Sequence, residues 1–257
     1  MADHRQTVVV ETVDQLLQTR SRRDFLRLLA AGGAAVLLPG VFAACDDDDG
    51  GGPAGLGGGT GATVTLDFGD ANDVGALNYA YALEQLEAAF YTEVVARSSG
   101  VLTADEANIM ADIRNHEAIH AAFFREALGA SAIGALALSR SFTNIDFGNR
   151  TAVLNAARDF EDTGVAAYNG AAQYLKQGAN VLTTAKIVSV EARHAAVIRD
   201  MLSPNAAVGA STSFAPRAFD EALDVPAVSD RVQGYIVQKL QPSNKPDPAP
   251  IITPATA

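Results

Sequence analysis

Cysteine is almost absent from this sequence. Among 257 residues there is one, Cys45, so no intrachain disulfide can form and no zinc or iron–sulfur site can be built from cysteines. Basic residues are also few, because 19 Lys and Arg stand against 30 Asp and Glu, for a formal net charge of −11. Nucleic-acid binding needs Lys and Arg to meet phosphates, so we expect no nucleic-acid partner. Strand-like alternation is scarce, and Ala-rich helical runs favour an all-α fold.

The first 45 residues have the pattern of an export signal. Arg22 and Arg23 precede an uncharged apolar run, residues 28–44, which is short for a membrane span and is interrupted by Gly and Pro. This pattern resembles a twin-arginine export signal, and the "FAAC" that ends at Cys45 resembles a lipoprotein cleavage box. An uncleaved anchor, or ordinary cleavage nearby, is the alternative. We expect export to the periplasm or cell envelope, with membrane contact only through a lipid anchor at Cys45.

An Asp- and Gly-rich stretch follows the cysteine. Residues 46–71 begin with four aspartates and contain many glycines. Such a composition buries too little apolar surface to fold, so it predicts a flexible linker.

Four long helices are expected in a domain over residues 72–204. Their approximate ranges are 73–100, 103–128, 150–177 and 184–202. Asp73 is the expected N-cap of the first, and Thr103 with Glu106 has the spacing of a capping box at the start of the second. Gly129 and Gly178 are expected to end the second and third helices. These lengths favour an antiparallel four-helix bundle, with a long connection between the second and third helices.

Residues 205–257 are expected to form an irregular C-terminal extension. It contains one short helix, with Asp224 as its cap and Pro226 in its first turn. A Pro-rich tail, extended or disordered, follows from residue 241.

Each long helix carries a glutamate in the middle of its apolar stripe. In the second helix the stripe, at spacings of three and four, is Ile109, Ile113, Glu117, His120, Phe124 and Leu128. The stripes of the other helices place Glu84, Glu161 and Glu191 in the same central position, the last with His194 one turn on. Burying one unpaired carboxylate costs several kcal/mol, so four of them need compensation.

The sequence also contains an internal repeat. A helix with Glu and Tyr seven residues apart precedes a helix with Glu-x-x-His, and this pair occurs twice. The repeated residues are Glu84, Tyr91, Glu117 and His120, and then Glu161, Tyr168, Glu191 and His194. Glu87 also lies on or near the inner face, but Glu84 is preferred because a tyrosine follows it at seven residues. His116 lies beside Glu117 but off the stripe, and is expected to be a partly exposed helix residue.

Two divalent cations would supply the charge that four buried carboxylates lack. Glu and His at i and i+3 share a helix face, so both can reach one ion. Oxygen-rich donors with one nitrogen per ion suit iron or manganese. The expected ligands are Glu84, Glu117, His120, Glu161, Glu191 and His194. Tyr91 and Tyr168 are candidate catalytic residues outside the ligand set, with hydroxyls that bond a carboxylate or a bridging oxygen.

At these residues the sequence resembles the ferritin-like superfamily, in which two helices give a Glu and two give Glu-x-x-His. Segments such as "RNHEAIHAAFF" and "SVEARHAAVIRDML" are similar to exported bacterial ferritin-like proteins akin to plant desiccation-related proteins. The resemblance implies a carboxylate-bridged pair of metal ions, two Fe or alternatively two Mn. It implies that Glu117 and Glu191 bridge the ions, and that Glu84 with His120, and Glu161 with His194, are terminal ligands.

Several functions follow from this resemblance. A di-iron site would react with oxygen or peroxide, as a ferroxidase or a peroxide-consuming enzyme, and a dimanganese catalase-like site is a close variant. A non-enzymatic envelope protein for stress or desiccation, with a structural or vestigial metal, is the main alternative. Iron sequestration without turnover lies between them. The expected partners are metal ions and oxygen or peroxide, and an oligomer is compatible with each function.

Overall fold

The computed structural model describes residues 62–138, 142–207 and 209–247. The predicted export signal, the cleavage box at Cys45 and most of the predicted linker lie outside these ranges, as do the last ten residues of the Pro-rich tail. Among the described residues, no helix combines the length and the apolar character needed to cross a bilayer.

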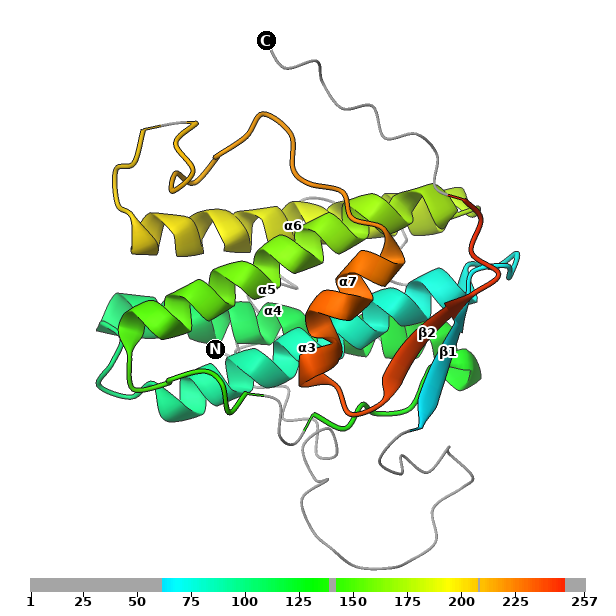
Figure 1. The fold of residues 1–257 in the computed structure, drawn as a ribbon, viewed down its shortest axis with the longest axis horizontal. Coiled ribbons are helices and arrows are strands. Elements are labelled where there is room, and N and C mark those ends of the chain that lie inside the picture. The colour runs from blue at the N-terminus through cyan, green and yellow to red at the C-terminus, as the bar shows by residue number, and fades with distance from the viewer. Residues whose placement is uncertain (1–61, 139–141, 208, 248–257) are drawn as a thin grey trace, which may run out of the picture. The chain divides into compact units, whose positions relative to one another are not determined.

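Four long helices make up most of the structure (Figure 1). They are α3 (Val74–Arg97), α4 (Ala104–Leu128), α5 (Arg150–Ala171) and α6 (Gly178–Leu202). Helix α3 packs along α4, and α5 packs along α6. The connection between α4 and α5 is the longest within the bundle and begins with a 3-10 turn, Gly129–Ser131. The prediction of an all-α, ferritin-like four-helix bundle with a long second connection is confirmed.

The helix starts show how local signals set the fold. At α4 the Thr103 hydroxyl accepts a hydrogen bond from Glu106 N at 3.3 Å, and the Glu106 carboxylate accepts one from Thr103 N at 2.9 Å. This is the predicted capping box, and Gly129 follows the last residue of α4 as expected. The short helix α7 (Val225–Val232) begins at Asp224, whose carboxylate accepts a hydrogen bond from Val225 N at 2.8 Å.

The boundary between the third and fourth helices was predicted wrongly. Helix α5 ends at Ala171, a 3-10 turn (Ala172–Tyr174) follows, and Gly178 begins α6 instead of ending α5. The cause is Asp73, which makes no side-chain cap on α3. Its carboxylate instead accepts hydrogen bonds from Lys176 N at 2.8 Å and Gln177 N at 2.9 Å, at the start of α6. A residue about a hundred positions away therefore fixes where α6 begins.

Two short strands, one near each end of the described chain, pair with each other. Strand β1 (Thr63–Asp67) runs parallel to β2 (Lys239–Ser243), with Thr63 opposite Lys239. The predicted linker, residues 46–71, was therefore too long at its C-terminal end, and the predicted Pro-rich tail begins inside β2. Leu66 and Leu240 face inward from the two strands and are buried. Strand β1 packs against α3, and α7 packs against α5 and β2.

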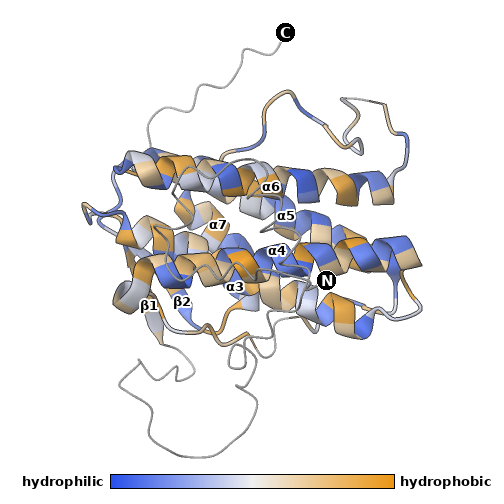
Figure 2. Cartoon of the chain, turned by 180° about the vertical axis from the view of Figure 1, so that it is seen from behind, coloured by the Kyte–Doolittle hydropathy of each residue, from blue (hydrophilic) through white to orange (hydrophobic). Residues whose placement is uncertain are grey.

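The interior of the bundle combines an apolar lining with buried charge. Hydrophilic and hydrophobic residues are interspersed along each long helix (Figure 2). On α4, Ile113, Glu117, Phe124 and Leu128 of the predicted inner stripe are buried, so one carboxylate lies among large apolar side chains. Fully buried apolar residues from all four helices, among them Phe90, Met110, Leu154 and Ile198, close the rest of the core.

Candidate metal centre

The six predicted ligands converge at the centre of the bundle. Glu84 comes from α3, Glu117 and His120 from α4, Glu161 from α5, and Glu191 and His194 from α6. The four glutamates are all 0% exposed. Their carboxylate oxygens and the imidazole nitrogens form two groups, each with all its ligand atoms within 4.8 Å of one another.

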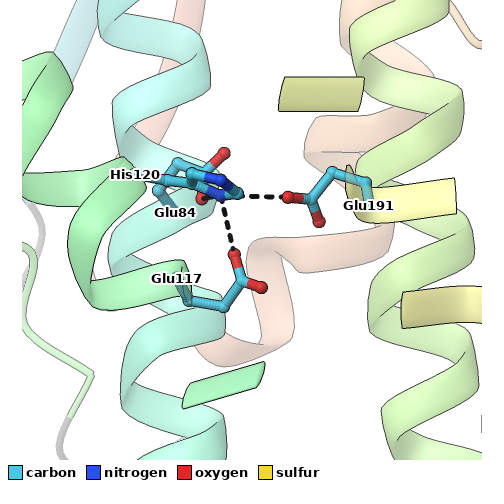
Figure 3. A group of neighbouring side chains, drawn as sticks. All are labelled: Glu84, Glu117, His120 and Glu191. Carbon is cyan, nitrogen blue, oxygen red and sulfur yellow. Dashed lines mark hydrogen bonds and ion pairs between the residues drawn. The ribbon is translucent and has the colours of Figure 1, made fainter. Parts of the chain in front are cut away.

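The first group surrounds one nitrogen of His120 (Figure 3). His120 Nδ1 lies 3.3 Å from an oxygen of Glu84, 3.3 Å from an oxygen of Glu117 and 3.0 Å from an oxygen of Glu191. These carboxylates come from three different helices. One imidazole nitrogen can donate at most one proton, so three acceptors around it exceed what a hydrogen bond can satisfy.

The second group surrounds His194 in the same way. His194 Nδ1 lies 3.0 Å from an oxygen of Glu117, 3.4 Å from an oxygen of Glu161 and 4.0 Å from an oxygen of Glu191. The two groups therefore share two carboxylates. Glu117 directs Oε2 to His120 and Oε1 to His194, and Glu191 directs Oε1 to His120 and Oε2 to His194.

Two tyrosines hold the unshared carboxylates. Tyr91 of α3 donates its hydroxyl hydrogen bond to Glu161 of α5 at 2.5 Å, and Tyr168 of α5 donates to Glu84 of α3. The prediction that these hydroxyls bond a carboxylate is confirmed. Each bond occupies Oε1 of its glutamate and leaves Oε2 facing a histidine. The reciprocal pair also ties α3 to α5 at the level of the centre.

Most of the remaining metal-ligand atoms have no hydrogen-bond partner; the exception is the contact between His120 Nδ1 and Glu117 Oε2. The buried unpartnered atoms of the centre are Glu84 Oε2, Glu117 Oε1, Glu161 Oε2, both oxygens of Glu191, and His194 Nδ1. Buried polar atoms are nearly always paired, so such a concentration indicates a missing partner. Two donors about 2.1 Å from one ion, at adjacent corners of an octahedron, lie about 3.0 Å apart. Five of the six nitrogen–oxygen separations, at 3.0–3.4 Å, fit that spacing, and the sixth, from His194 to Glu191, is 4.0 Å. The oxygen-rich donor set fits iron or manganese.

The centre perturbs the ionisation of its own members. Burial raises the pKa of Glu84 to about 7, although His120 opposes the rise. Burial would also raise the pKa of Glu117, but the close contacts and charges of His120 and His194 outweigh it and lower that pKa to about 2. Burial disfavours the charged form of His194, yet its contacts with Glu117 and Glu161 raise its pKa to about 10. Protons on the imidazoles would therefore compete with cations for the space between the carboxylates.

His116 is a neighbour of the centre that the sequence did not reveal. Its Nδ1 lies 2.8 Å from Nε2 of His194, and the two rings stack with their centroids 5.1 Å apart. It is exposed, in line with the expectation of a partly exposed helix residue, yet it lies within hydrogen-bond distance of the nitrogen of His194 that faces away from the carboxylates. A histidine that binds a metal usually has such a partner on its other nitrogen.

The structure also gives Glu84 and Glu87 different positions relative to the two groups of ligands. Glu84 belongs to the group around His120, as the preference for it predicted, and Glu87 belongs to neither group. Glu87 is nevertheless buried, at 3% exposed, and one of its oxygens has no hydrogen-bond partner. It is a further buried carboxylate whose role the sequence left unassigned.

Comparison with known proteins agrees with this architecture. The family model described as "Ferritin-like domain" matches residues 72–204, which is more than half of the chain and spans α3–α6. A comparison with curated proteins gave no match. With a family match over the whole bundle and a buried cluster of acidic residues and histidines that could hold metal, this chain belongs to the ferritin-like domain family.

Proposed function

We propose that the protein binds a carboxylate-bridged pair of iron ions at the centre of the bundle and uses them in oxygen- or peroxide-dependent redox chemistry. The observation that carries this proposal is the sharing of two carboxylates. Glu117 and Glu191 each present one oxygen to the group of His120 and the other to the group of His194. A carboxylate placed between two sets of donors is suited to bridge two ions.

Charge is consistent with two ions. The four glutamates of the two groups carry four negative charges when ionised, and all four are fully buried. Two divalent cations balance that charge, whereas with one ion the balance would also need protons on the imidazoles or carboxylates. The two imidazoles, when neutral, add one nitrogen donor to each ion without changing the balance.

Each residue has a distinct task in this proposal. Glu117 and Glu191 would hold both ions, while Glu84 and Glu161 would each hold one through the oxygen that their tyrosine does not occupy. Tyr91 and Tyr168 fix the orientation of these terminal carboxylates. The bound iron would supply electron exchange with oxygen or peroxide, and the apolar lining of the bundle would keep bulk water from the centre.

The cell envelope is the proposed location. The twin-arginine pattern at Arg22 and Arg23 and the box that ends at Cys45 support it. Twin-arginine export carries folded cargo, which suits a metal loaded before transport. Replacement of both arginines by lysine should keep the protein in the cytoplasm, as measured by cell fractionation. Cys45→Ser should abolish incorporation of labelled fatty acid; an unlabelled wild-type protein would reject the lipid anchor.

Anaerobic metal loading tests the function directly. Full-length protein incubated with excess Fe(II), and then desalted, should retain two iron ions per chain and give an absorbance rise when pulsed with oxygen or peroxide. Glu117→Ala should retain none and give no rise. Elemental analysis of protein purified from cells separates iron from manganese. If the wild type retains no transition metal, the proposal is rejected. If Glu117→Ala loses metal but cells keep their stress resistance, a non-enzymatic role replaces it.

A further inference from the structure

A cavity of about 300 Å³ lies between α5, α6 and the chain that connects α6 to α7 (Figure 1). Small or apolar side chains form one side of it, namely Val165 of α5 and Ala192, Ala195 and Ala196 of α6. The segment 214–221 lines the other side. None of the six expected metal ligands is among the residues that line it. The cavity is therefore distinct from the metal centre.

The segment that covers the cavity is held to α5 at its C-terminal end. The Asn169 amide donates a hydrogen bond to the backbone oxygen of Glu221 at 3.1 Å, and Leu223 N donates one to Ala166 O at 2.9 Å. Gly170 permits this close approach, because a Cβ there would lie 1.7 Å from the backbone oxygen of Leu223. Packed interiors leave few voids larger than a water molecule, whereas pockets for small molecules begin at about 300 Å³. The covered space thus has the size of a small-molecule site.

Three of the charged side chains that line the cavity already have partners. Arg199 of α6 donates a hydrogen bond to Asp162 of α5 at 2.5 Å, and this ion pair is partly buried. Glu221 lies 3.8 Å from Arg231 of α7. Each of these charges is compensated by its neighbour, so they give the cavity little preference for a charged ligand.

Two further charges and one aromatic ring of the wall are free to meet a ligand. Arg217 and Asp220 both line the cavity and are exposed. Within the described part of the chain, neither is paired with an opposite charge, and they do not pair with each other. Phe214 also lines the cavity and is 52% exposed. The wall therefore offers one cation, one anion and an apolar surface to the same occupant.

We propose that this cavity binds a free amino acid with an apolar or aromatic side chain. The ligand carboxylate pairs with Arg217, whose guanidinium fork matches a carboxylate, and the ligand ammonium pairs with Asp220. The side chain of the ligand packs on Phe214 and on the alanines of α6. A ligand with only one of the two charges leaves Arg217 or Asp220 without a partner, so the wall favours a zwitterion. The inference does not depend on the dimetal function.

Three probes of similar size separate the contributions of the two charges. Phenylalanine carries both charges, 3-phenylpropanoate carries only the carboxylate, and 2-phenylethylamine carries only the ammonium. Each is titrated into the full-length protein, as purified, and binding is followed by calorimetry. Phenylalanine should bind the wild type about three- to tenfold more tightly than either of the other two, because charge-assisted contacts at an exposed wall contribute modestly.

Substitutions of the wall should change the affinities in a specific pattern. Arg217→Gln should weaken the binding of phenylalanine and 3-phenylpropanoate but not of 2-phenylethylamine. Asp220→Asn should weaken the binding of phenylalanine and 2-phenylethylamine but not of 3-phenylpropanoate. Ala196→Leu fills part of the cavity and should weaken all three. Arg193→Gln is the matched control, since Arg193 is exposed on α6 and bonds Ser189 at 2.9 Å; it should bind as the wild type does.

The pattern of affinities decides the inference. Loss of the carboxylate probe in Arg217→Gln and of the amine probe in Asp220→Asn supports it. A wild-type protein that binds no phenylalanine at millimolar concentration would overturn it. Unchanged phenylalanine binding in Arg217→Gln, Asp220→Asn and Ala196→Leu would also overturn it, because the probe would then lie elsewhere. Equal or tighter binding of a singly charged probe would contradict a zwitterion site. Both charge variants alter exposed side chains and should fold, and circular dichroism checks all four.

Discussion

Removal of a shared carboxylate should have a larger effect on metal-dependent stability than removal of an unshared one. Glu117 faces both histidines at 3.3 and 3.0 Å, whereas Glu84 faces only His120, at 3.3 Å. Glu117→Gln therefore removes a charged ligand that both ions share, and Glu84→Gln removes one that serves a single ion. Both side chains are fully buried, so the two variants are matched in burial and in the group they lose.

The magnitude follows from linkage between binding and folding. An ion at a free concentration of about 100 times its Kd stabilises the fold by about 2.7 kcal/mol, and two independent ions by about 5.4 kcal/mol. For a domain of this size each kcal/mol shifts Tm by about 2–4 °C. The wild type should thus gain about 11–22 °C in Tm on metal loading. Glu84→Gln should keep about half of that gain, and Glu117→Gln little or none.

Thermal unfolding, followed by circular dichroism with a chelator or with excess Mn(II), measures these gains. Each variant is compared with its own metal-free form, so the effect of the substitution on the apo protein cancels. Glu93→Gln, exposed on α3, should keep the full gain. Equal gains in Glu84→Gln and Glu117→Gln would refute the division into shared and unshared ligands.

The remaining predictions concern protons, a tyrosine and a glycine. Metal affinity should rise from pH 6 to pH 8, by about tenfold per pH unit for each proton released. The reason is that His194, with a pKa of about 10, and Glu84, with a pKa of about 7, must lose protons to bind an ion. A flat pH profile in competition titrations would contradict this. Tyr168→Phe leaves Glu84 without its donor and should destabilise the apo protein by about 1–3 kcal/mol in urea unfolding; an unchanged midpoint would show that the bond is dispensable. Gly170→Ala would place a Cβ 1.7 Å from the backbone oxygen of Leu223. Because the backbone must shift, the substitution should lower the free energy of unfolding by about 1–3 kcal/mol or more. An unchanged free energy of unfolding would mean that the segment before α7 is loosely held.

The convergence of the ligands could be predicted because helical periodicity is local. Glu117 and His120, three residues apart, must share a face of α4, and the same spacing places Glu191 beside His194 on α6. The pairing of tyrosine with glutamate at seven residues selected Glu84. Periodicity alone could not separate Glu84 from Glu87, because the two residues are three positions apart and both face inward; the structure shows that Glu87 belongs to neither group of ligands.

The errors in the fold came from contacts between distant parts of the chain. Gly178 has the local character of a helix end, yet Asp73 binds the preceding backbone amides and starts α6 there. Strand β1, with the sequence TVTLD, follows the Gly-rich stretch and carries the β-branched residues typical of a strand, but it is too short to be assigned without its partner, Lys239–Ser243. The contact of Asp73 leaves no pattern in the segment that it orders. His116 is similar, since its partner His194 lies on another helix.

The metal content of the full-length protein, purified without chelators from cells grown with iron and manganese, tests the dimetal centre most directly. Elemental analysis should find two transition-metal ions per chain in the wild type and none in Glu117→Ala. A wild-type protein that is folded, yet carries no transition metal at near-stoichiometric level and takes none up under anaerobic loading, would contradict the proposal that the four buried carboxylates are held by a pair of cations.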